Sequence, residues 1–403
     1  MSHVIVVGAG QAGASLVARL RAKGFDGRIT LIGEEPFPPY QRPPLSKAYL
    51  LGEMERERLY LRPESYYAEN DIDLRLGAPV TEIDADAQTV TVAGETLGYD
   101  DLVFATGSEP RRLPAAIGGD LDGVLLVRGL RDVDAMGPRF ARGARVLIVG
   151  GGYIGLEAAA VAAKRGLSVT LVEMAERILQ RVAAPETSAY FRALHTAHGV
   201  DIREGVGLDH LTGTDGAVTG AVLTDGSSLE LDFVLVGVGI LPHTALAQAA
   251  GVTIENGIKT DAHGRTSVAN IWAAGDCASF PWRGQQLRLE SVGNAIDQAE
   301  CVADNILGAE CAYDAKPWFW SDQYDVKLQI AGLSTGYDRI VVREGDGDTV
   351  SHWYFSGETL LAIDAMNDPR SYMVGKRLIE AGKSPSPEAV RDTSTDLKAL
   401  LKA

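Results

Sequence analysis

Two glycine-rich motifs with the same spacing are the residues best suited to hold a charged cofactor. The letters GAGQAG occupy residues 8–13, and GGGYIG occupies residues 150–155. In such a turn the first glycine makes the bend from strand to helix, the second lets the backbone approach a pyrophosphate, and the third lets the helix pack on the sheet. The helix N-terminus then attracts the phosphate charge. We therefore predict two dinucleotide sites, lined by Gly8, Gly10, Ala12 and Gly13 in the first motif and by Gly150, Gly152, Tyr153, Ile154 and Gly155 in the second.

An acidic residue follows the second strand predicted after each motif. Glu34 comes after the apolar run at 29–32, and Glu173 comes after the run at 169–172. A carboxylate at this place hydrogen-bonds the ribose of a dinucleotide and would repel the additional phosphate of NADPH, so Glu173 predicts a preference for NADH. Arg177 and Arg181 argue the other way, because a nearby arginine can accommodate that phosphate.

Other predicted strands also end in small residues that let a cofactor approach the backbone. The strand at 99–104 runs into Ala105, Thr106 and Gly107, and the strand at 233–238 ends at Gly239. The strand at 270–274 leads to Asp276, whose carboxylate could bind the ribityl hydroxyls of a flavin or cap a helix N-terminus.

A proline-rich loop at 36–44 follows the first nucleotide unit. Proline fixes φ and removes a hydrogen-bond donor, so we expect a rigid surface excursion. Arg42 of this loop is included among the residues predicted to bind a cofactor.

The elements that must position these residues repeat one plan twice. Residues 4–7 and 146–149 are apolar runs that lead into the two glycine turns, and an alanine-rich helix follows each, the first over about 11–23. Beyond about residue 320 the pattern changes to short alternating runs separated by glycines, which predicts an antiparallel sheet. Helices are expected at about 369–381 and, after the Ser-Pro-Ser-Pro break at 384–387, at about 392–402.

Composition narrows the class of protein. A chain of 403 residues is long enough for two or three domains, and 46% apolar with 23% charged residues is ordinary for a globular protein. No apolar run approaches the roughly 20 residues of a membrane helix. The first strand begins by His3 or Val4, so we expect no targeting segment and a cytoplasmic location. A net charge of −16 disfavours nucleic acid and anionic membranes as partners.

Cysteines and histidines predict neither a redox dithiol nor a metal site. The chain contains only Cys277, Cys301 and Cys311, in no CxxC pair, which argues against electron transfer through a disulfide. A bridge between Cys301 and Cys311 is not expected in a cytoplasmic protein. His195 and His198 have helical spacing, but we expect them on the surface rather than on a metal.

Several segments together carry a family resemblance. They are PPLSK at 43–47, ATG at 105–107, GGGYIGLE at 150–157, AGD at 274–276, ESV at 290–292 and WFWSDQ at 318–323. With them the chain resembles, over its whole length, the FAD-dependent NADH:ferredoxin reductases that serve bacterial haem-thiolate monooxygenases and aromatic-ring dioxygenases. The glycine motifs are common to all two-dinucleotide flavin reductases, whereas the first and last segments are much more specific.

The resemblance implies an α/β fold with two Rossmann-like domains in a glutathione-reductase-like arrangement. An FAD-binding domain would comprise residues 1–109 and 241–319, an inserted NAD-binding domain residues 110–240, and a C-terminal α/β domain residues 320–403. It further implies FAD and NADH as cofactors and a small 2Fe-2S ferredoxin as transient partner. The FAD contacts that it implies come from Ala12, Glu34 at the ribose, Lys47, Val80 at the adenine, Arg128, Asp276 and Val292, with Trp320 near the flavin.

Two charged residues are predicted to act in catalysis. Lys47 follows the rigid proline loop and Glu157 lies in the helix after the second glycine motif, so we expect an ion pair beside flavin N5 although 110 residues separate them. Lys47 would favour negative charge on the reduced flavin, while Glu157 would fix the lysine and border the nicotinamide site.

A basic rim is expected to receive the acidic ferredoxin despite the acidic net charge, because steering depends on the local field. The candidate residues are Arg283, Arg288, Lys316, Lys327, Arg339 and Arg343. The alternatives share the two-dinucleotide architecture: a rubredoxin reductase or another NADH-dependent flavin reductase, or a redox signalling protein of the apoptosis-inducing-factor type. An NADH oxidase or peroxidase would need a cysteine that residues 36–50 do not contain.

Overall fold

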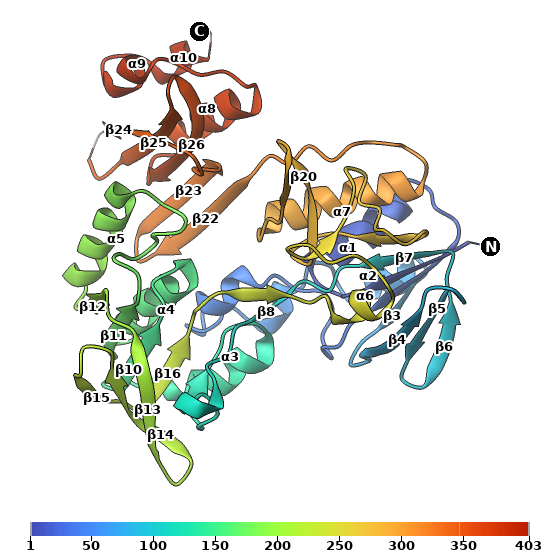
Figure 1. Ribbon diagram of the computed structural model, residues 1–403, viewed down its shortest axis with the longest axis horizontal. Coiled ribbons are helices and arrows are strands. Elements are labelled where there is room, and N and C mark those ends of the chain that lie inside the picture. The colour runs from blue at the N-terminus through green and yellow to red at the C-terminus, as the bar shows by residue number, and fades with distance from the viewer. Residues whose placement is uncertain (1, 346, 402–403) are drawn as a thin grey trace. The chain divides into compact units, whose positions relative to one another are not determined.

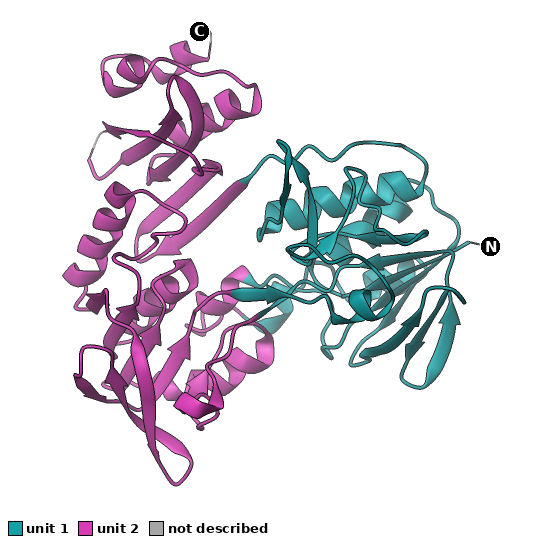
Figure 2. Ribbon diagram, viewed as in Figure 1, with its two compact units in different colours: residues 1–42, 55–109, 240–317 teal, residues 43–54, 110–239, 318–403 magenta. Residues whose placement is uncertain are grey.

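The computed structural model describes residues 2–345 and 347–401, and this part of the chain divides into two compact units (Figures 1 and 2). Unit 1 comprises residues up to 42, 55–109 and 240–317. Unit 2 comprises residues 43–54, 110–239 and those from 318 onward. The short segment 43–54 therefore packs with unit 2, although it falls within residues 1–109 of the predicted FAD-binding domain.

A five-stranded parallel sheet forms the centre of unit 1. Its order is β19-β7-β1-β2-β3, so the strand before the first glycine motif lies in the middle. Buried aliphatic side chains from helices α1 and α7 pack against it, which explains why the first helix is rich in small apolar residues. The elements are β1 (His3–Val7), α1 (Gln11–Ala22), β2 (Arg28–Ile32), β3 (Ile72–Arg75), β7 (Asp101–Phe104), β19 (Ile271–Ala273) and α7 (Val292–Ile306).

Smaller elements complete unit 1. A meander of β4 (Val80–Asp84), β5 (Thr89–Val92) and β6 (Glu95–Gly98) packs under the parallel sheet. The others are η2 (Arg56–Leu59), α2 (Ser65–Glu69), β8 (Ser108–Pro110), β17 (Ile240–Pro242), α6 (Ala245–Ala249), β18 (Ile258–Lys259), β20 (Ala278–Trp282) and β21 (Gln285–Leu287).

Unit 2 contains a second parallel sheet of the same design. Its order is β12-β11-β10-β16-β9, and β10, which precedes the second glycine motif, is again central. The elements are η1 (Pro43–Ser46), η3 (Ala115–Ile117), β9 (Val124–Leu125), α3 (Leu130–Met136), η4 (Gly137–Arg139), β10 (Arg145–Val149), α4 (Tyr153–Lys164), β11 (Ser168–Glu173), α5 (Pro185–Ala197), β12 (Asp201–Glu204) and β16 (Phe233–Val236), with a small sheet of β13 (Leu208–Thr214), β14 (Ala217–Leu223) and β15 (Ser228–Glu230).

The C-terminal part of unit 2 is the predicted antiparallel sheet. Its order is β22-β23-β26-β25-β24, and helix α8 packs on it (Figure 1). The elements are β22 (Trp318–Gln323), β23 (Val326–Gly332), β24 (Arg339–Glu344), β25 (Val350–Ser356), β26 (Thr359–Met366), α8 (Pro369–Glu380), α9 (Pro387–Arg391) and α10 (Leu397–Leu400).

The predicted final helix at 392–402 is wrong in extent. Helix α9 already begins at Pro387, because the Ser386 hydroxyl caps it and proline is well suited to the first helical position. Only the four residues of α10 are helical further on among the described residues. Within the part of the chain that the structure describes, no helix has the length and apolar character needed to span a bilayer.

Candidate functional site

The first glycine turn keeps one glycine open to a ligand. Gly8 has φ +119°, and a Cβ placed on it would lie 2.1 Å from the carbonyl oxygen of Ala105. A Cβ on Gly13 would lie 2.0 Å from the carbonyl oxygen of Gly8. Both glycines are thus required by the protein's own packing. A Cβ on Gly10, in contrast, would meet no described atom within 4 Å.

The second turn repeats this geometry in unit 2. Gly150 has φ +109°, and its Cβ would lie 2.4 Å from the carbonyl oxygen of Gly237. A Cβ on Gly155 would lie 2.1 Å from the carbonyl oxygen of Gly150. Gly152 again faces open space, with no described atom within 4 Å of a Cβ.

The open glycines are also the N-caps of the helices. Gly10 caps α1 and Gly152 caps α4, and neither helix start has a side-chain cap. The positive end of each helix dipole is therefore accessible where a phosphate would approach. This cradle fits the pyrophosphate of a dinucleotide in each unit.

The acidic residues differ in their contacts. Glu173 ends β11, and its carboxylate accepts hydrogen bonds from the backbone N–H groups of Gly151 at 2.7 Å and Ala175 at 2.8 Å. It therefore lies beside the second turn. Arg177 donates to the Ser188 hydroxyl at 2.6 Å. The guanidinium is therefore already engaged by the protein and less available to bind the additional phosphate of NADPH. Glu34 is exposed, two residues after β2.

Arg42 and Asp276 both belong to unit 1. The Arg42 guanidinium pairs with the Glu35 carboxylate at 2.6 Å and lies over the Tyr40 ring, so a neighbouring acid already engages it. Asp276 accepts a hydrogen bond from the Ser108 hydroxyl at 3.2 Å. The helix-cap alternative for Asp276 is wrong, because strand β20 follows it and α7 is capped by Ser291.

The remaining predicted contacts of unit 1 lie at the ends of elements. Val80 begins β4 and Val292 begins α7. Ala105, Thr106 and Gly107 follow β7, and the Thr106 hydroxyl donates to the carbonyl oxygen of His243.

The predicted pair of Lys47 and Glu157 is present in unit 2. The Lys47 Nζ lies 2.6 Å from Glu157 Oε2, and the two side chains are 19% and 6% exposed. The lysine also donates to the carbonyl oxygen of Pro43 at 3.3 Å. Glu157 lies on α4, so the carboxylate of this pair belongs to the same helix as the second glycine turn.

Serine hydroxyls complete the carboxylate's hydrogen bonds. Ser46 donates to Glu157 Oε2 at 3.0 Å, and Ser321 donates to Glu157 Oε1 at 2.8 Å. Both serines belong to the motifs at 43–47 and 318–323, but the sequence predicted no role for either of them. The signal that could have found Ser321 is the alternation of β22, in which Ser321 and Gln323 are polar but buried.

The segment that carries Lys47 is tied to unit 2 by several contacts. Arg165, at the end of α4, donates to the carbonyl oxygens of Leu50 and Leu51. The Tyr49 hydroxyl donates to Asp134 of helix α3 at 2.7 Å. These contacts explain why residues 43–54 follow α4 rather than the sheet of unit 1.

Aromatic residues gather near the start of α4. The Tyr153 ring lies 5.0 Å from the Phe319 ring, and Trp320 stacks on Trp318 at 5.5 Å. Trp320 is half-buried, while Ile154 is exposed. Burial raises the pKa of the Tyr153 hydroxyl, which has no hydrogen-bond partner among the described residues.

Arg128 and Gly239 are the other predicted contacts in unit 2. Arg128 precedes α3, where its backbone N–H donates to the Asp132 carboxylate. Gly239 follows β16 with φ +99°, and Arg111 and Arg181 approach it. Both residues are partly buried.

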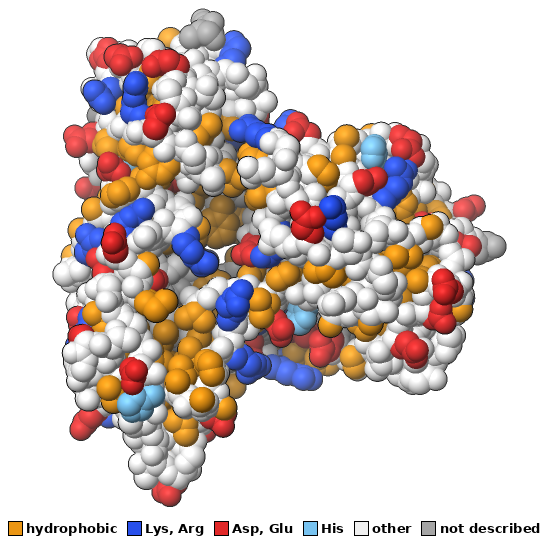
Figure 3. All heavy atoms as spheres, viewed as in Figure 1, with side chains coloured by type: hydrophobic (Ala, Val, Ile, Leu, Met, Phe, Trp, Pro, Cys, Tyr) orange, Lys and Arg blue, Asp and Glu red, His pale blue; other side chains and the backbone are white. Residues whose placement is uncertain are grey.

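Two of the proposed docking arginines are corrected by the structure. Arg343 is buried and donates to the backbone carbonyls of Val390 and Asp392, so it holds the C-terminal loops and offers no surface charge. The Arg288 side chain is 12% exposed and paired with Glu290. Lys327 and Arg339 are exposed. On the face in Figure 3, acidic and basic side chains are interspersed.

The expected surface location of His195 is also wrong. His195 is fully buried on α5, where it contacts the Gln323 amide at 2.8 Å and the Tyr324 hydroxyl at 3.2 Å. Burial lowers its pKa to about 4. His198 is exposed and stacks on the Tyr324 ring. No group of three metal-ligating side chains is found within residues 2–345 and 347–401.

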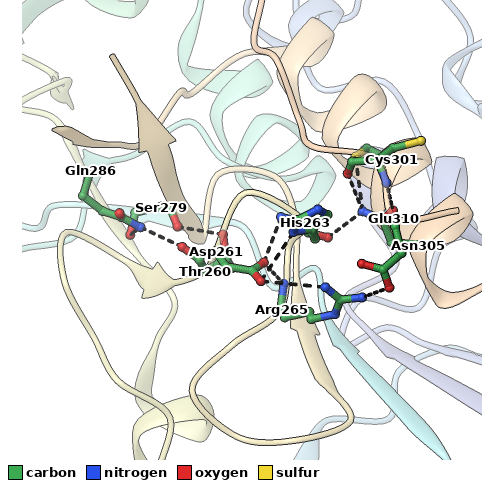
Figure 4. A network of polar contacts seen from close by, with 10 residues as sticks. Thr260, Asp261, His263, Arg265, Ser279, Gln286, Cys301, Asn305 and Glu310 are labelled. Carbon is green, nitrogen blue, oxygen red and sulfur yellow. Dashed lines mark hydrogen bonds and ion pairs between the residues drawn. The ribbon is translucent and has the colours of Figure 1, made fainter. Parts of the chain in front are cut away.

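The cysteines carry free thiols, as expected. Cys277 is buried, Cys301 is partly buried and Cys311 is exposed. Figure 4 shows Cys301 beside Asn305, whose amide donates to the backbone carbonyl oxygens of His263 and Cys311 at 2.9 and 2.8 Å. Hydrogen bonds rather than a disulfide therefore join these loops of unit 1.

Comparison with known proteins covers almost the whole chain. A family model described as pyridine nucleotide-disulphide oxidoreductase matches residues 2–299, and one described as reductase C-terminal matches residues 318–401. Rhodocoxin reductase from Rhodococcus erythropolis is 42% identical over 402 residues, which cover 99% of this chain and 94% of that protein. A ferredoxin–NAD(P)(+) reductase from a Sphingomonas species is 45% identical over 385 residues, covering 94% and 92%.

A solved structure has the same fold at high similarity. It is the covalent putidaredoxin reductase–putidaredoxin complex, which matches with a TM-score of 0.95 and 41% identity. The match covers 100% of this chain and 98% of that one.

Proposed function

Because this chain belongs to the pyridine nucleotide-disulphide oxidoreductase family and, within it, to the ferredoxin reductases, we propose that it passes electrons from NADH through FAD to a small 2Fe-2S ferredoxin. It is an FAD- and NAD(P)H-dependent oxidoreductase. The ferredoxin would supply a haem-thiolate monooxygenase or a ring-hydroxylating dioxygenase.

The observation that carries this proposal is the design of helix α4. Its N-cap, Gly152, leaves open space for a pyrophosphate, and Glu157 on the same helix pairs with Lys47 of the segment after η1. One helix thus forms the dinucleotide turn and, through Glu157, fixes the position of a positive charge. A charge held in this way favours negative charge that develops during hydride transfer.

Each group has a separate task in this mechanism. Bound FAD supplies the conversion of a two-electron donor into single electrons. The turns at Gly10 and Gly152 hold the pyrophosphates through helix N-termini. Glu173 favours NADH over NADPH, since a carboxylate repels a ribose phosphate, and Arg177 is already engaged by Ser188.

The electrons are proposed to leave without a protein disulfide. The three cysteines form no CxxC pair, and Cys277 is buried with a raised pKa, so no reactive dithiol is available. Unpaired thiols also support a cytoplasmic location, where a reducing environment keeps them free.

An acceptor panel tests the proposal. The FAD-loaded protein is mixed with saturating NADH and, in turn, a 2Fe-2S ferredoxin, a rubredoxin or ferricyanide. We expect ferredoxin reduction with a higher kcat/KM than rubredoxin reduction. Rubredoxin preferred over every ferredoxin would support the rubredoxin reductase alternative. Slow NADH oxidation together with no reduction of either protein acceptor would favour the redox signalling protein instead.

A further inference from the structure

A continuous path of hydrogen bonds leads from the Glu157 carboxylate across unit 2. Ser321 Oγ lies 2.8 Å from Glu157 Oε1, and Gln323 Nε2 lies 3.1 Å from Ser321 Oγ. Gln323 Oε1 then lies 2.8 Å from His195 Nε2, and the Tyr324 hydroxyl lies 3.2 Å from His195 Nδ1. The path therefore joins α4, β22 and α5, and ends at the residue that follows β22.

Every donor on this path is directed toward the carboxylate. The amide oxygen of Gln323 can only accept, so the proton of neutral His195 must be on Nε2. His195 Nδ1 then accepts from the Tyr324 hydroxyl. In the same direction, the Gln323 amide donates to Ser321, and the Ser321 hydroxyl donates to Glu157. Aligned hydrogen bonds polarise one another, so each of them strengthens the hydrogen bond that holds the Glu157 carboxylate.

The path is shielded from water. Ser321, Gln323 and His195 are each 0% exposed, and Glu157 is 5% exposed. A buried polar side chain is costly unless it is hydrogen-bonded, so these residues are held in place by one another. Burial lowers the pKa of His195 to about 4, which keeps the ring neutral at neutral pH, as the chain of donors requires.

The strand explains how two residues of one motif share a task. Successive side chains of a strand point to opposite faces, so Ser321 and Gln323 of β22 lie on one face. Helix α4 packs against β22, which brings Glu157 to that face. The WFWSDQ motif thus presents its two neutral polar residues to the buried carboxylate.

We propose that Ser321, Gln323 and His195 are positioning residues that hold the Glu157 carboxylate in place and directed at Lys47. This inference rests on the proposed function, because the Lys47–Glu157 pair is assigned there. Loss of the path would let the Glu157 carboxylate turn and release Lys47 from its fixed position. These residues would act only through Glu157 and would not touch the cofactors.

The other charged groups near Glu157 do not replace this path. Of the elements packed on α4, the segment after η1 contributes Lys47, the charged group in contact with the carboxylate. On β11, Glu173 is bound to Gly151, and on β10, Arg145 pairs with Glu230. On β22, Asp322 lies on the opposite face from Ser321.

The test reports the hydrogen bonding of Glu157 directly. Infrared difference spectra of the FAD-loaded protein contain the carboxylate stretching bands of Glu157, which are assigned by their absence in E157Q. We expect Ser321→Ala to shift these bands, because Glu157 Oε1 loses the hydroxyl that donates to it. Gln323→Leu should shift them less, and Tyr324→Phe least. The rate of flavin reduction by NADH should fall in the same order.

Two further variants separate positioning from general damage. Ser351→Ala is the matched control, since Ser351 is an equally buried serine of the same sheet that accepts from Trp353 and lies off the path. It should leave the Glu157 bands unchanged. Ser321→Thr keeps the hydroxyl, so its Glu157 bands should lie close to those of the wild type. If Ser321→Ala does not fold, Tyr324→Phe, which removes one half-buried hydroxyl, serves instead.

The possible outcomes distinguish the positioning role of Ser321, Gln323 and His195 from the proposed role of Lys47. Glu157 bands at the same position in Ser321→Ala and Ser351→Ala, or a band shift in Tyr324→Phe as large as in Ser321→Ala, would overturn the inference. A graded infrared shift with an unchanged rate of flavin reduction would support the path but count against the proposed role of Lys47. The failure of one proposal is therefore distinguishable from the failure of the other.

Discussion

Replacement of Lys47 by methionine tests the central claim about the site. Methionine keeps most of the side-chain length and removes the charge. In the protein, Lys47 Nζ lies 2.6 Å from a Glu157 side chain that is only 6% exposed. The substitution therefore leaves a buried carboxylate without its cation, while the hydroxyls of Ser46 and Ser321 remain bound to it.

Two separate magnitudes are expected from Lys47→Met. Removal of one partner from a buried ion pair costs about 3–5 kcal/mol. Because Lys47 is itself 19% exposed and two serines still bind Glu157, we expect a smaller loss of unfolding free energy, about 2 kcal/mol. Flavin reduction by NADH should slow at least about tenfold, which corresponds to about 1.4 kcal/mol of transition-state stabilisation.

The assay separates these two effects with a double variant. Lys47→Met combined with Glu157→Gln removes both charges, so the unfolding free energy should recover most of its loss, because interacting residues are not additive. The rate of flavin reduction, followed by anaerobic stopped-flow absorbance, should not recover. Lys164→Met is the matched control: Lys164 pairs with Glu53 between the same two segments, but both side chains are more than half exposed. It should change stability by less than about 1 kcal/mol and leave the rate unchanged.

Three results would refute this reasoning. One is an unchanged rate of flavin reduction in a folded Lys47→Met protein that contains its full complement of FAD. Another is an equal loss of rate in Lys164→Met. The third is recovery of the rate in the double variant, which would mean that the buried charge of Glu157, rather than the missing lysine, slowed the reaction.

Four further predictions concern specificity, the turn, pH and the partner. The wild type should show a higher kcat/KM with NADH than with NADPH. Glu173→Gln should lower the ratio of these two kcat/KM values at least about tenfold. A ratio near one in the wild type would contradict the role of Glu173. Gly152→Ala should raise the Kd for NADH with little change in Tm. Gly155→Ala should lower Tm, because its Cβ would lie 2.1 Å from the Gly150 carbonyl oxygen. Equal effects of the two substitutions on Tm would refute this prediction. The pKa of His195 is depressed to about 4, so its contribution to stability is present above about pH 6.5 and is lost as the pH falls toward 4. The free energy of unfolding, measured with denaturant, should fall by up to about 3 kcal/mol less in His195→Gln than in the wild type over this pH range. The same pH dependence of the unfolding free energy in both proteins would contradict this prediction. Finally, kcat/KM for ferredoxin should fall as salt rises while ferricyanide reduction stays flat; a salt-independent ferredoxin reaction would argue against electrostatic docking.

The sequence by itself determined the two glycine turns and the class of sheet around them. The strand, the glycine turn and the helix lie within about 20 residues, so neighbouring residues alone set the required φ angles and the close packing of the turn. The alternation beyond residue 320 likewise predicted the antiparallel sheet, because each strand carries its own period. Lys47 was predicted to lie at the flavin from the resemblance to the ferredoxin reductases, because the hydrophobic periodicity of the sequence does not indicate it.

Only the tertiary structure decided which polar side chains are buried and what they bind. Arg343 and His195 both look like surface residues in the sequence, yet the loops after α9 enclose the first, and β22 covers the second. Ser321 lies 164 residues from the carboxylate that it binds. The alternation of β22 could place Ser321 on one face of the strand, but its hydrogen-bond partner arises from the packing of segments that are distant in the chain.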